Sequence, residues 1–121
     1  MAAAPKDNLI VDLTLDFAVE FILYAEALEN QRKFVIANQL LKSGSSIGSN
    51  VREAQNAESK ADFIHKFQIA AKEVEETEYW LLLCQRVPSY PDPIHLQDKL
   101  KPIKRIISKI IISTKTGKKE N

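Results

Sequence analysis

The sequence lacks several features that mark particular classes of protein. Cys84 is its only cysteine, so no disulfide can form within the chain, which argues against a disulfide-stapled secreted domain. No apolar run approaches the roughly 18 residues that a membrane-spanning helix needs. The opening residues, MAAAPKDN, have no signal-peptide core. We therefore expect a cytoplasmic protein without a membrane partner.

Residue patterns for catalysis are also missing. The glycines of GSSIGS, residues 44–49, have neither the spacing nor the preceding strand of a phosphate-binding loop. Four glutamates crowd one segment, but they spread around a helix instead of converging on a pocket as an acid–base pair would. These are Glu73, Glu75, Glu76 and Glu78. We predict no catalytic residues and no small-molecule substrate.

One carboxylate–histidine spacing is present, because Asp62 and His65 share a helix face three residues apart. Bundles that hold two metal ions use two such motifs together with carboxylates from other helices. The only other histidine, His95, follows Asp92 at the same spacing, but Asp92 is the expected cap before the fourth helix and does not lie on a helix face. We therefore predict no metal site and no cofactor, and we expect a protein that is not an enzyme.

Apolar residues do recur every three or four positions in four stretches, as they do on one face of an α-helix. The strongest stretch begins at Ser59, whose side chain together with Asp62 suits a helix N-terminus. The predicted helices cover about residues 12–30, 34–57, 59–87 and 93–113. With short links between them, they predict an all-α fold, an antiparallel up-down four-helix bundle, as a single domain over residues 1–121. We expect the ends, residues 1–8 and 115–121, to be mobile.

Two of the predicted helices contain residues that disfavour an α-helix, namely glycines and serines in the second and a proline in the fourth. The segment SGSSIGS, residues 43–49, is a poor helix former, and a turn at Ser43–Ser46 is the alternative. The apolar period passes through this segment without a change of phase, so we predict one continuous helix. Pro102 lies inside the fourth stretch, where it either bends the helix or marks its start after an irregular turn at residues 93–101. We favour the bend.

The predicted helices carry more apolar surface than one bundle covers. Ala37, Leu41, Gly44 and Gly48 form a second stripe about a quarter-turn from the main one, and Trp80 lies off the main stripe of the third helix. The first helix has a second stripe of its own at Leu15, Ala18, Ile22 and Ala25. An exposed apolar patch of this kind usually marks a partner surface. We predict an interface with further copies of the chain that contains Ala37, Leu41, Gly44, Gly48 and Trp80.

Polar residues near the predicted core need partners, because a half-buried charge is tolerated only when it is paired. Asn50 and Glu53 lie beside the core stripe of the second helix, and Lys66 and Glu73 lie along one flank of the third. We expect these four residues to form polar pairs between helices or between subunits. The alternative, that they reach solvent, stays open.

Charge is distributed unevenly, although the formal net charge is only +1. Residues 1–30 carry one basic and six acidic side chains, whereas residues 91–121 carry eight basic and three acidic ones. Lys42 and Arg52 share the face of the second helix opposite its core stripe. This segregation fits either a basic surface for nucleic acid that includes these two residues, or acidic and basic helices that pair with each other.

Three sequence blocks resemble a known bacterial family. They are residues 39–54, QLLKSGSSIGSNVREA, residues 62–66, DFIHK, and residues 72–81, KEVEETEYWL. In this order they resemble the four-helix-bundle proteins called 23S rRNA intervening-sequence proteins, over roughly residues 10–112. The resemblance implies an up-down bundle that forms a ring-like homopentamer. It also implies kinship with the accessory protein of diversity-generating retroelements, which binds nucleic acid.

The chain differs from that retroelement branch because it is nearly neutral, whereas the branch is strongly basic. Affinity for nucleic acid depends largely on phosphate neutralisation by Lys and Arg, so two functions stay open. One is a self-associating bundle, a pentamer by resemblance, that binds RNA or DNA weakly through Lys42 and Arg52. The other is an oligomeric scaffold or adaptor for a protein partner, with no role in nucleic-acid binding.

Overall fold

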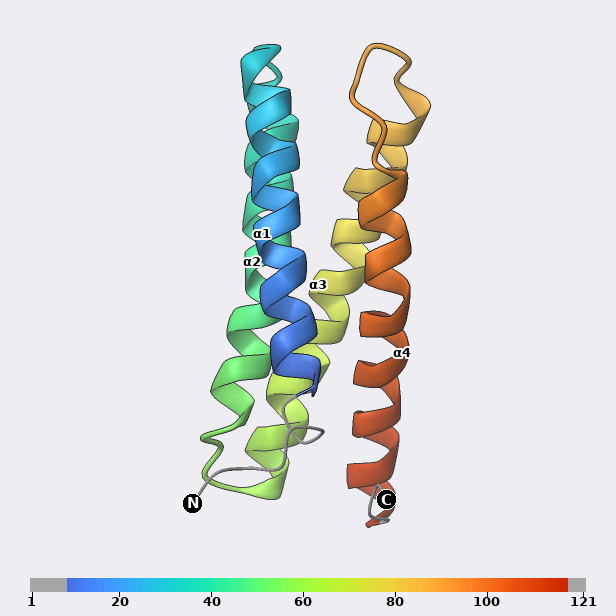
Figure 1. The fold of residues 1–121 in the computed structure, drawn as a ribbon. Coiled ribbons are helices and arrows are strands. Elements are labelled where there is room, and N and C mark those ends of the chain that lie inside the picture. Colours follow the sequence, from blue (N-terminus) through green and yellow to red (C-terminus); the bar gives the residue numbers. More distant parts are fainter. Residues whose placement is uncertain (1–8, 118–121) are drawn as a thin grey trace.

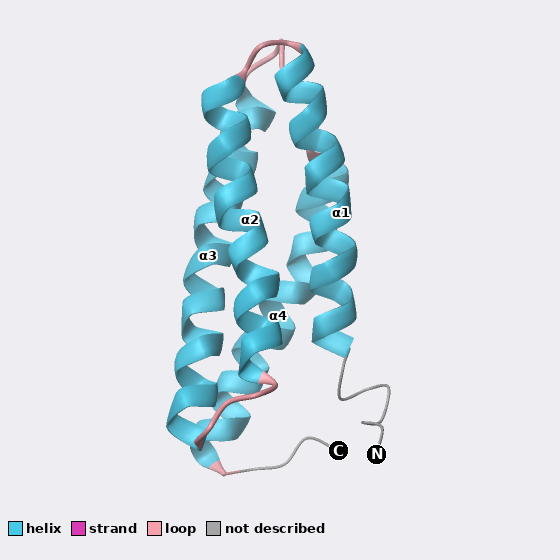
Figure 2. Cartoon of the chain, turned by 90° about the vertical axis from the view of Figure 1, so that its left-hand side faces the viewer, coloured by secondary structure: helices cyan, strands magenta, loops and turns pink. Residues whose placement is uncertain are grey.

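Four α-helices make up the described part of the chain, residues 9–117, in the computed structural model. The helices are α1 (Leu9–Asn30), α2 (Phe34–Ala54), α3 (Lys60–Arg86) and α4 (Ile94–Thr116). Figure 1 shows that successive helices run in opposite directions, and α1 and α3 each pack against both α2 and α4. Figure 2 shows helices over almost the whole described length, joined by short loops. The prediction of an all-α four-helix bundle is confirmed, since residues 9–117 contain no strand.

The observed helix ends lie within a few residues of the predicted ones. α1 begins at Leu9 rather than near residue 12, and α2 ends three residues earlier than predicted. α3 begins as its sequence indicates, because the hydroxyl of Ser59 accepts a hydrogen bond from the backbone N–H of Asp62 at 3.0 Å. Two segments that we expected to be mobile, residues 1–8 and 118–121, lie outside the described residues.

α4 is one helix with Pro102 in its interior. The alternative start near Pro102 is therefore wrong, while a bend there stays a prediction. Proline has no N–H, so the carbonyl of Asp98 lacks the donor that a helix normally supplies four residues on. The helix ends where Gly117 adopts a left-handed conformation with a φ of 76°. Residues 115 and 116 belong to this helix, and the mobility expected of residues 115–121 stays a prediction.

α2 is continuous through its glycine–serine segment, as predicted. Gly44 faces α1, where a Cβ atom would lie only 2.7 Å from the ring of Phe21. Ser43 is buried, and its hydroxyl lies 2.8 Å from the hydroxyl of Thr77 in α3. The weak helix propensity of the segment is offset by the close approach of α1 and by this hydrogen bond to α3.

The core runs along the bundle and takes side chains from all four helices. Burying one large apolar side chain contributes about 1.5–3 kcal/mol, so these residues dominate the stability of the fold. The largest fully buried side chains are Phe17, Phe21, Leu28, Leu40, Ile47, Val51, Phe67, Val74, Leu81, Leu100, Ile103 and Ile107. No helix within residues 9–117 combines the length and the apolar character needed to cross a membrane.

One side chain of α1 and one of the α1–α2 turn contact the α3–α4 loop at one end of the bundle. The hydroxyl of Tyr24 donates a hydrogen bond to the carbonyl of Pro91 at 2.5 Å, and Lys33 Nζ lies 5.8 Å from the ring centroid of Tyr90. Cys84 is buried beside Tyr24, and burial raises the pKa of its thiol. The cysteine therefore acts as a small core residue.

Candidate assembly and nucleic-acid interfaces

Within residues 9–117, no group of three histidine, cysteine or acidic side chains is arranged to hold a metal ion. Asp62, one of the two residues considered as metal ligands with His65, instead makes a hydrogen bond at the start of α3. Its carboxylate accepts a hydrogen bond from the backbone N–H of Glu58 at 3.3 Å. The candidate sites are therefore surfaces, namely an apolar face, a basic face and a groove.

Two of the five predicted interface residues lie inside the bundle. Ala37 has no exposed surface, and Gly44 is buried against the ring of Phe21. The predicted contact with another copy is wrong for these two, because α1 of the same chain occupies the space beside Gly44 and the bundle itself encloses Ala37. The other three are half-buried and retain exposed surface, namely Leu41, Gly48 and Trp80.

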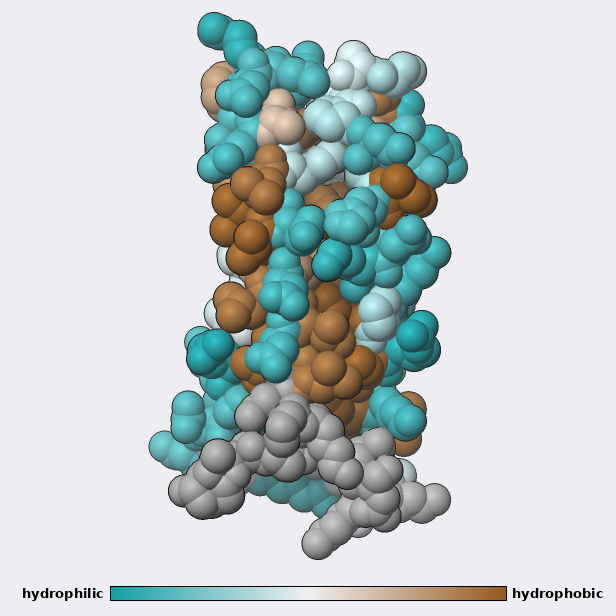
Figure 3. All heavy atoms as spheres, in the orientation of Figure 1, coloured by the Kyte–Doolittle hydropathy of each residue, from teal (hydrophilic) through white to brown (hydrophobic). Residues whose placement is uncertain are grey.

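The most extensive exposed apolar face lies on α1, and Figure 3 shows hydrophobic surface along this helix. Leu15, Val19, Ile22 and Leu23 have 53, 53, 44 and 60 % of their surface exposed. Their spacing of i, i+4, i+7 and i+8 places them on one side of the helix. The predicted second stripe included Leu15 and Ile22, but its Ala25 is buried. The sequence analysis missed Val19 and Leu23. A signal for them was present, because α1 is apolar around most of its circumference and contacts only two helices, so part of its apolar surface must be exposed.

A groove of about 280 Å³ lies between α1 and α2, beside this α1 face. Small and apolar side chains line it together with one cation, and the lining residues are Val11, Thr14, Leu15, Ala18, Ser45, Gly48, Ser49 and Arg52. Arg52 is exposed and makes no ion pair with a described residue. One of the two predicted nucleic-acid residues thus borders the apolar face.

Lys42, the second predicted nucleic-acid residue, is also exposed and lies ten residues before Arg52, about 15 Å away along α2. It lies close enough to Glu73 of α3 to oppose the rise in the pKa of that carboxyl. The two cations therefore occupy different edges of the exposed face of α2. Lys42 is on the α3 side and Arg52 is on the α1 side.

The four residues predicted to form polar pairs behave differently from one another. Glu53 and Lys66 do meet between α2 and α3, at 3.0 Å, and this hydrogen bond raises the pKa of the lysine. Asn50 instead donates to the carbonyl of Ser46 in its own helix at 2.8 Å. Glu73 makes no ion pair with a described residue, and partial burial, together with the nearby Glu76 carboxylate, raises its pKa.

Basic side chains of α4 contact carboxylates of both neighbouring helices. Lys104 Nζ lies 3.0 Å from Glu78 and 3.8 Å from Glu75 in α3. His95 and Lys99 lie 3.2 and 3.9 Å from the carboxylate of Glu20 in α1. Part of the charge segregation in the sequence thus serves pairing between helices. Exposed ion pairs of this kind contribute at most about 1 kcal/mol each.

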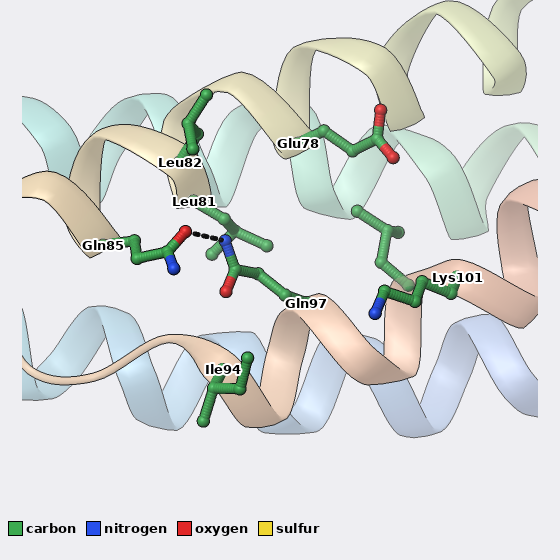
Figure 4. Close-up of a pocket in the computed structure, with 8 residues that line it drawn as sticks. Glu78, Leu81, Leu82, Gln85, Ile94, Gln97 and Lys101 are labelled. Carbon is green, nitrogen blue, oxygen red and sulfur yellow. Dashed lines mark hydrogen bonds between the residues drawn. The ribbon is translucent and has the colours of Figure 1, made fainter.

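A second groove, of about 400 Å³, lies between α3 and α4 (Figure 4). Leu81 and Leu100 are buried at its base, while Leu82 and Ile94 stand at its edges with 42 and 49 % of their surface exposed. The side-chain amide of Gln97 donates to the side-chain oxygen of Gln85 at 3.1 Å across the groove. Glu78 and Lys101 border its other end. The groove therefore combines an apolar base with polar and charged edges.

These features define an all-α four-helix bundle with an exposed apolar face and two surface grooves. The sequence model of the family described as 23S rRNA-intervening sequence protein matches residues 6–111, and the chain belongs to that family. The crystal structure of a protein with unknown function from the S23 ribosomal protein family of Bacteroides thetaiotaomicron VPI-5482 is similar, with a TM-score of 0.80 and 41 % sequence identity. The similarity covers 84 % of this chain and 97 % of that one. No curated protein matches the chain.

The family match confirms the resemblance carried by the three sequence blocks. The family's description names no reaction, and the solved relative has no known function.

Proposed function

We propose that the protein is a non-enzymatic, self-associating helical bundle that binds RNA or DNA weakly through a basic face. One observation carries the proposal, namely the exposed α1 face with Arg52 at the border of the adjoining groove. Contiguous exposed apolar surface of this kind marks a contact with a partner. A second copy of the same chain is the simplest partner, and the resemblance suggests a homopentamer. The single cysteine favours a cytoplasmic location.

Self-association matters for nucleic-acid binding because one copy carries almost no net positive charge. The formal net charge is only +1, and several lysines are held by carboxylates of neighbouring helices. In an assembly, Lys42 and Arg52 repeat once per copy, so several phosphates are neutralised together. Binding should then weaken steeply as salt rises, because each phosphate contact releases a counterion. The family's description refers to 23S rRNA, which agrees with an RNA ligand.

A titration of labelled RNA and DNA at 50 and 200 mM salt, followed by fluorescence anisotropy, tests this function. We expect weak binding at low salt that falls by at least about tenfold at high salt. The variant Lys42→Glu with Arg52→Glu should abolish it. Lys60→Glu with Arg86→Glu, which reverses two other exposed cations without ion pairs to described residues, is the matched control and should retain binding. Absence of binding at low salt, or equal loss in both double variants, would contradict the proposal.

The second candidate is an oligomeric scaffold or adaptor for a protein partner. It is favoured by the pairing of Lys66, Lys99 and Lys104 with carboxylates of neighbouring helices, which accounts for part of the charge segregation without a nucleic acid. An oligomer that binds neither RNA nor DNA in the same titration would support this candidate instead.

A further inference from the structure

We infer that one copy docks the exposed face of α1 into the α3–α4 groove of the next copy. This inference rests on the self-association proposed above and specifies its two surfaces. The contact joins two different surfaces, so each copy uses one surface on each side and the copies follow one another around a ring. The two surfaces do not compete, because α1 does not contact α3 within one chain.

The shapes of the two surfaces are complementary. A helix that docks in a groove presents apolar side chains at spacings of i, i+4 and i+7, which is the spacing of Leu15, Val19 and Ile22. The groove offers an apolar base with the exposed side chains of Leu82 and Ile94 at its edges. Both surfaces leave large apolar side chains in water when the chain is alone, and docking would remove them from water together.

The two surfaces lie at the same level along the bundle. Within one chain, Glu20 of α1 contacts both His95 and Lys99, so it lies level with about residue 97 of the antiparallel α4. Because the two helices rise equally per residue, Leu23 lies level with Ile94 at the groove's edge. Copies related by rotation about an axis along the bundle are not shifted along it, so docking surfaces must be level. They are level here, which favours a closed ring over a filament.

Exposed residues of opposite charge lie beside the two surfaces at matching levels. α1 contains acidic residues and no lysine or arginine, whereas Lys101 and Arg105 are exposed on α4 four residues apart. Asp16 and Asp12 are exposed on α1 with the same spacing. By the same count, Asp16 is level with Lys101 and Asp12 is level with Arg105.

The carboxylates of Glu78 and Asp98 lie near the groove of α3 and α4, but each has a lysine of the same chain beside it. Lys101 lies 3.4 Å from Asp98, and Lys104 lies 3.0 Å from Glu78. Lys101 is exposed, so its ammonium group can contact a second carboxylate as well as Asp98. The aspartates of α1 therefore still complement the charge of Lys101 and Arg105.

A charge exchange across the contact tests the inference. Asp16→Lys and Lys101→Glu should each raise the apparent dissociation constant of the assembly by at least about tenfold in light scattering after gel filtration. The double variant should restore assembly, because the two charges are then exchanged but remain opposite. Glu58→Lys and Lys60→Glu, in the α2–α3 turn and at the start of α3, are matched controls that should assemble as the wild type does. Circular dichroism melts establish that each variant is folded.

A cross-linking experiment with the full chain tests the docking of α1 in the α3–α4 groove separately from self-association itself. Leu23→Cys and Ile94→Cys chains should form a disulfide-linked pair when mixed and oxidised, while neither variant alone should do so. A wild-type assembly that forms no such pair and tolerates both charge reversals would overturn the inference and leave self-association in place. A monomeric wild type would overturn both.

Discussion

Gly44 sets the distance between α1 and α2, because it is the point at which the ring of Phe21 meets the backbone of α2. Phe21 is fully buried and packs against Phe17, with ring centroids 5.4 Å apart, so it has little room to move. Gly48 lies one turn later, where an added Cβ would make ordinary contact with Thr14 at 3.6 Å. Two glycines on one stripe therefore have different physical roles.

The two glycines should respond differently to alanine. Each substitution improves helix propensity by about 1 kcal/mol, but at Gly44 the new methyl group overpacks the core at a cost of about 1–3 kcal/mol. We expect Gly48→Ala to exceed Gly44→Ala in unfolding free energy by about 1–3 kcal/mol. Urea denaturation at one fixed protein concentration measures this difference. Equal stability of the two variants would contradict the close approach at Gly44.

Each helix could be predicted because an apolar stripe of five or more residues leaves little choice of secondary structure. The stripe also fixes which direction a side chain points around its helix. It does not fix which neighbour lies there, and small residues suit a helix of the same chain as well as one of another copy. For this reason Ala37 and Gly44 were assigned to the wrong contact, whereas two of the four residues expected to form polar pairs, Glu53 and Lys66, do meet between helices.

Pro102 is the residue of α4 with the lowest helix propensity. It removes the N–H that would bond to the carbonyl of Asp98, so Pro102→Ala should restore that hydrogen bond. We expect a gain of about 1–2 kcal/mol, since the better helix propensity of alanine is partly offset by greater freedom in the unfolded chain. Thermal melts measure it, with the exposed Ser108→Ala as a control that should change stability by less than about 0.5 kcal/mol. A loss of stability in Pro102→Ala would show that the ring of the proline is needed for packing.

At the scale of the whole molecule, the account depends on apolar surface that a single chain leaves in water. The inner faces of the helices are covered by one another, but the outer face of α1 has no cover within residues 9–117. The sequence indicated an excess of apolar surface without showing where it lies, because that depends on the order of the helices around the bundle. The order α1–α2–α3–α4 leaves α1 and the α3–α4 groove on different sides, where each is accessible to another copy.

Sedimentation velocity of the wild type beside Val19→Asp tests self-association through α1 most directly. A charge placed in the centre of an apolar contact loses its hydration there and should prevent docking, whereas in a single chain Val19 is already 53 % exposed. We predict that the wild type sediments as a defined multiple of 13.7 kDa and that Val19→Asp sediments at 13.7 kDa with an unchanged helical spectrum. A wild type that sediments at 13.7 kDa, or a variant that assembles as the wild type does, would contradict the account.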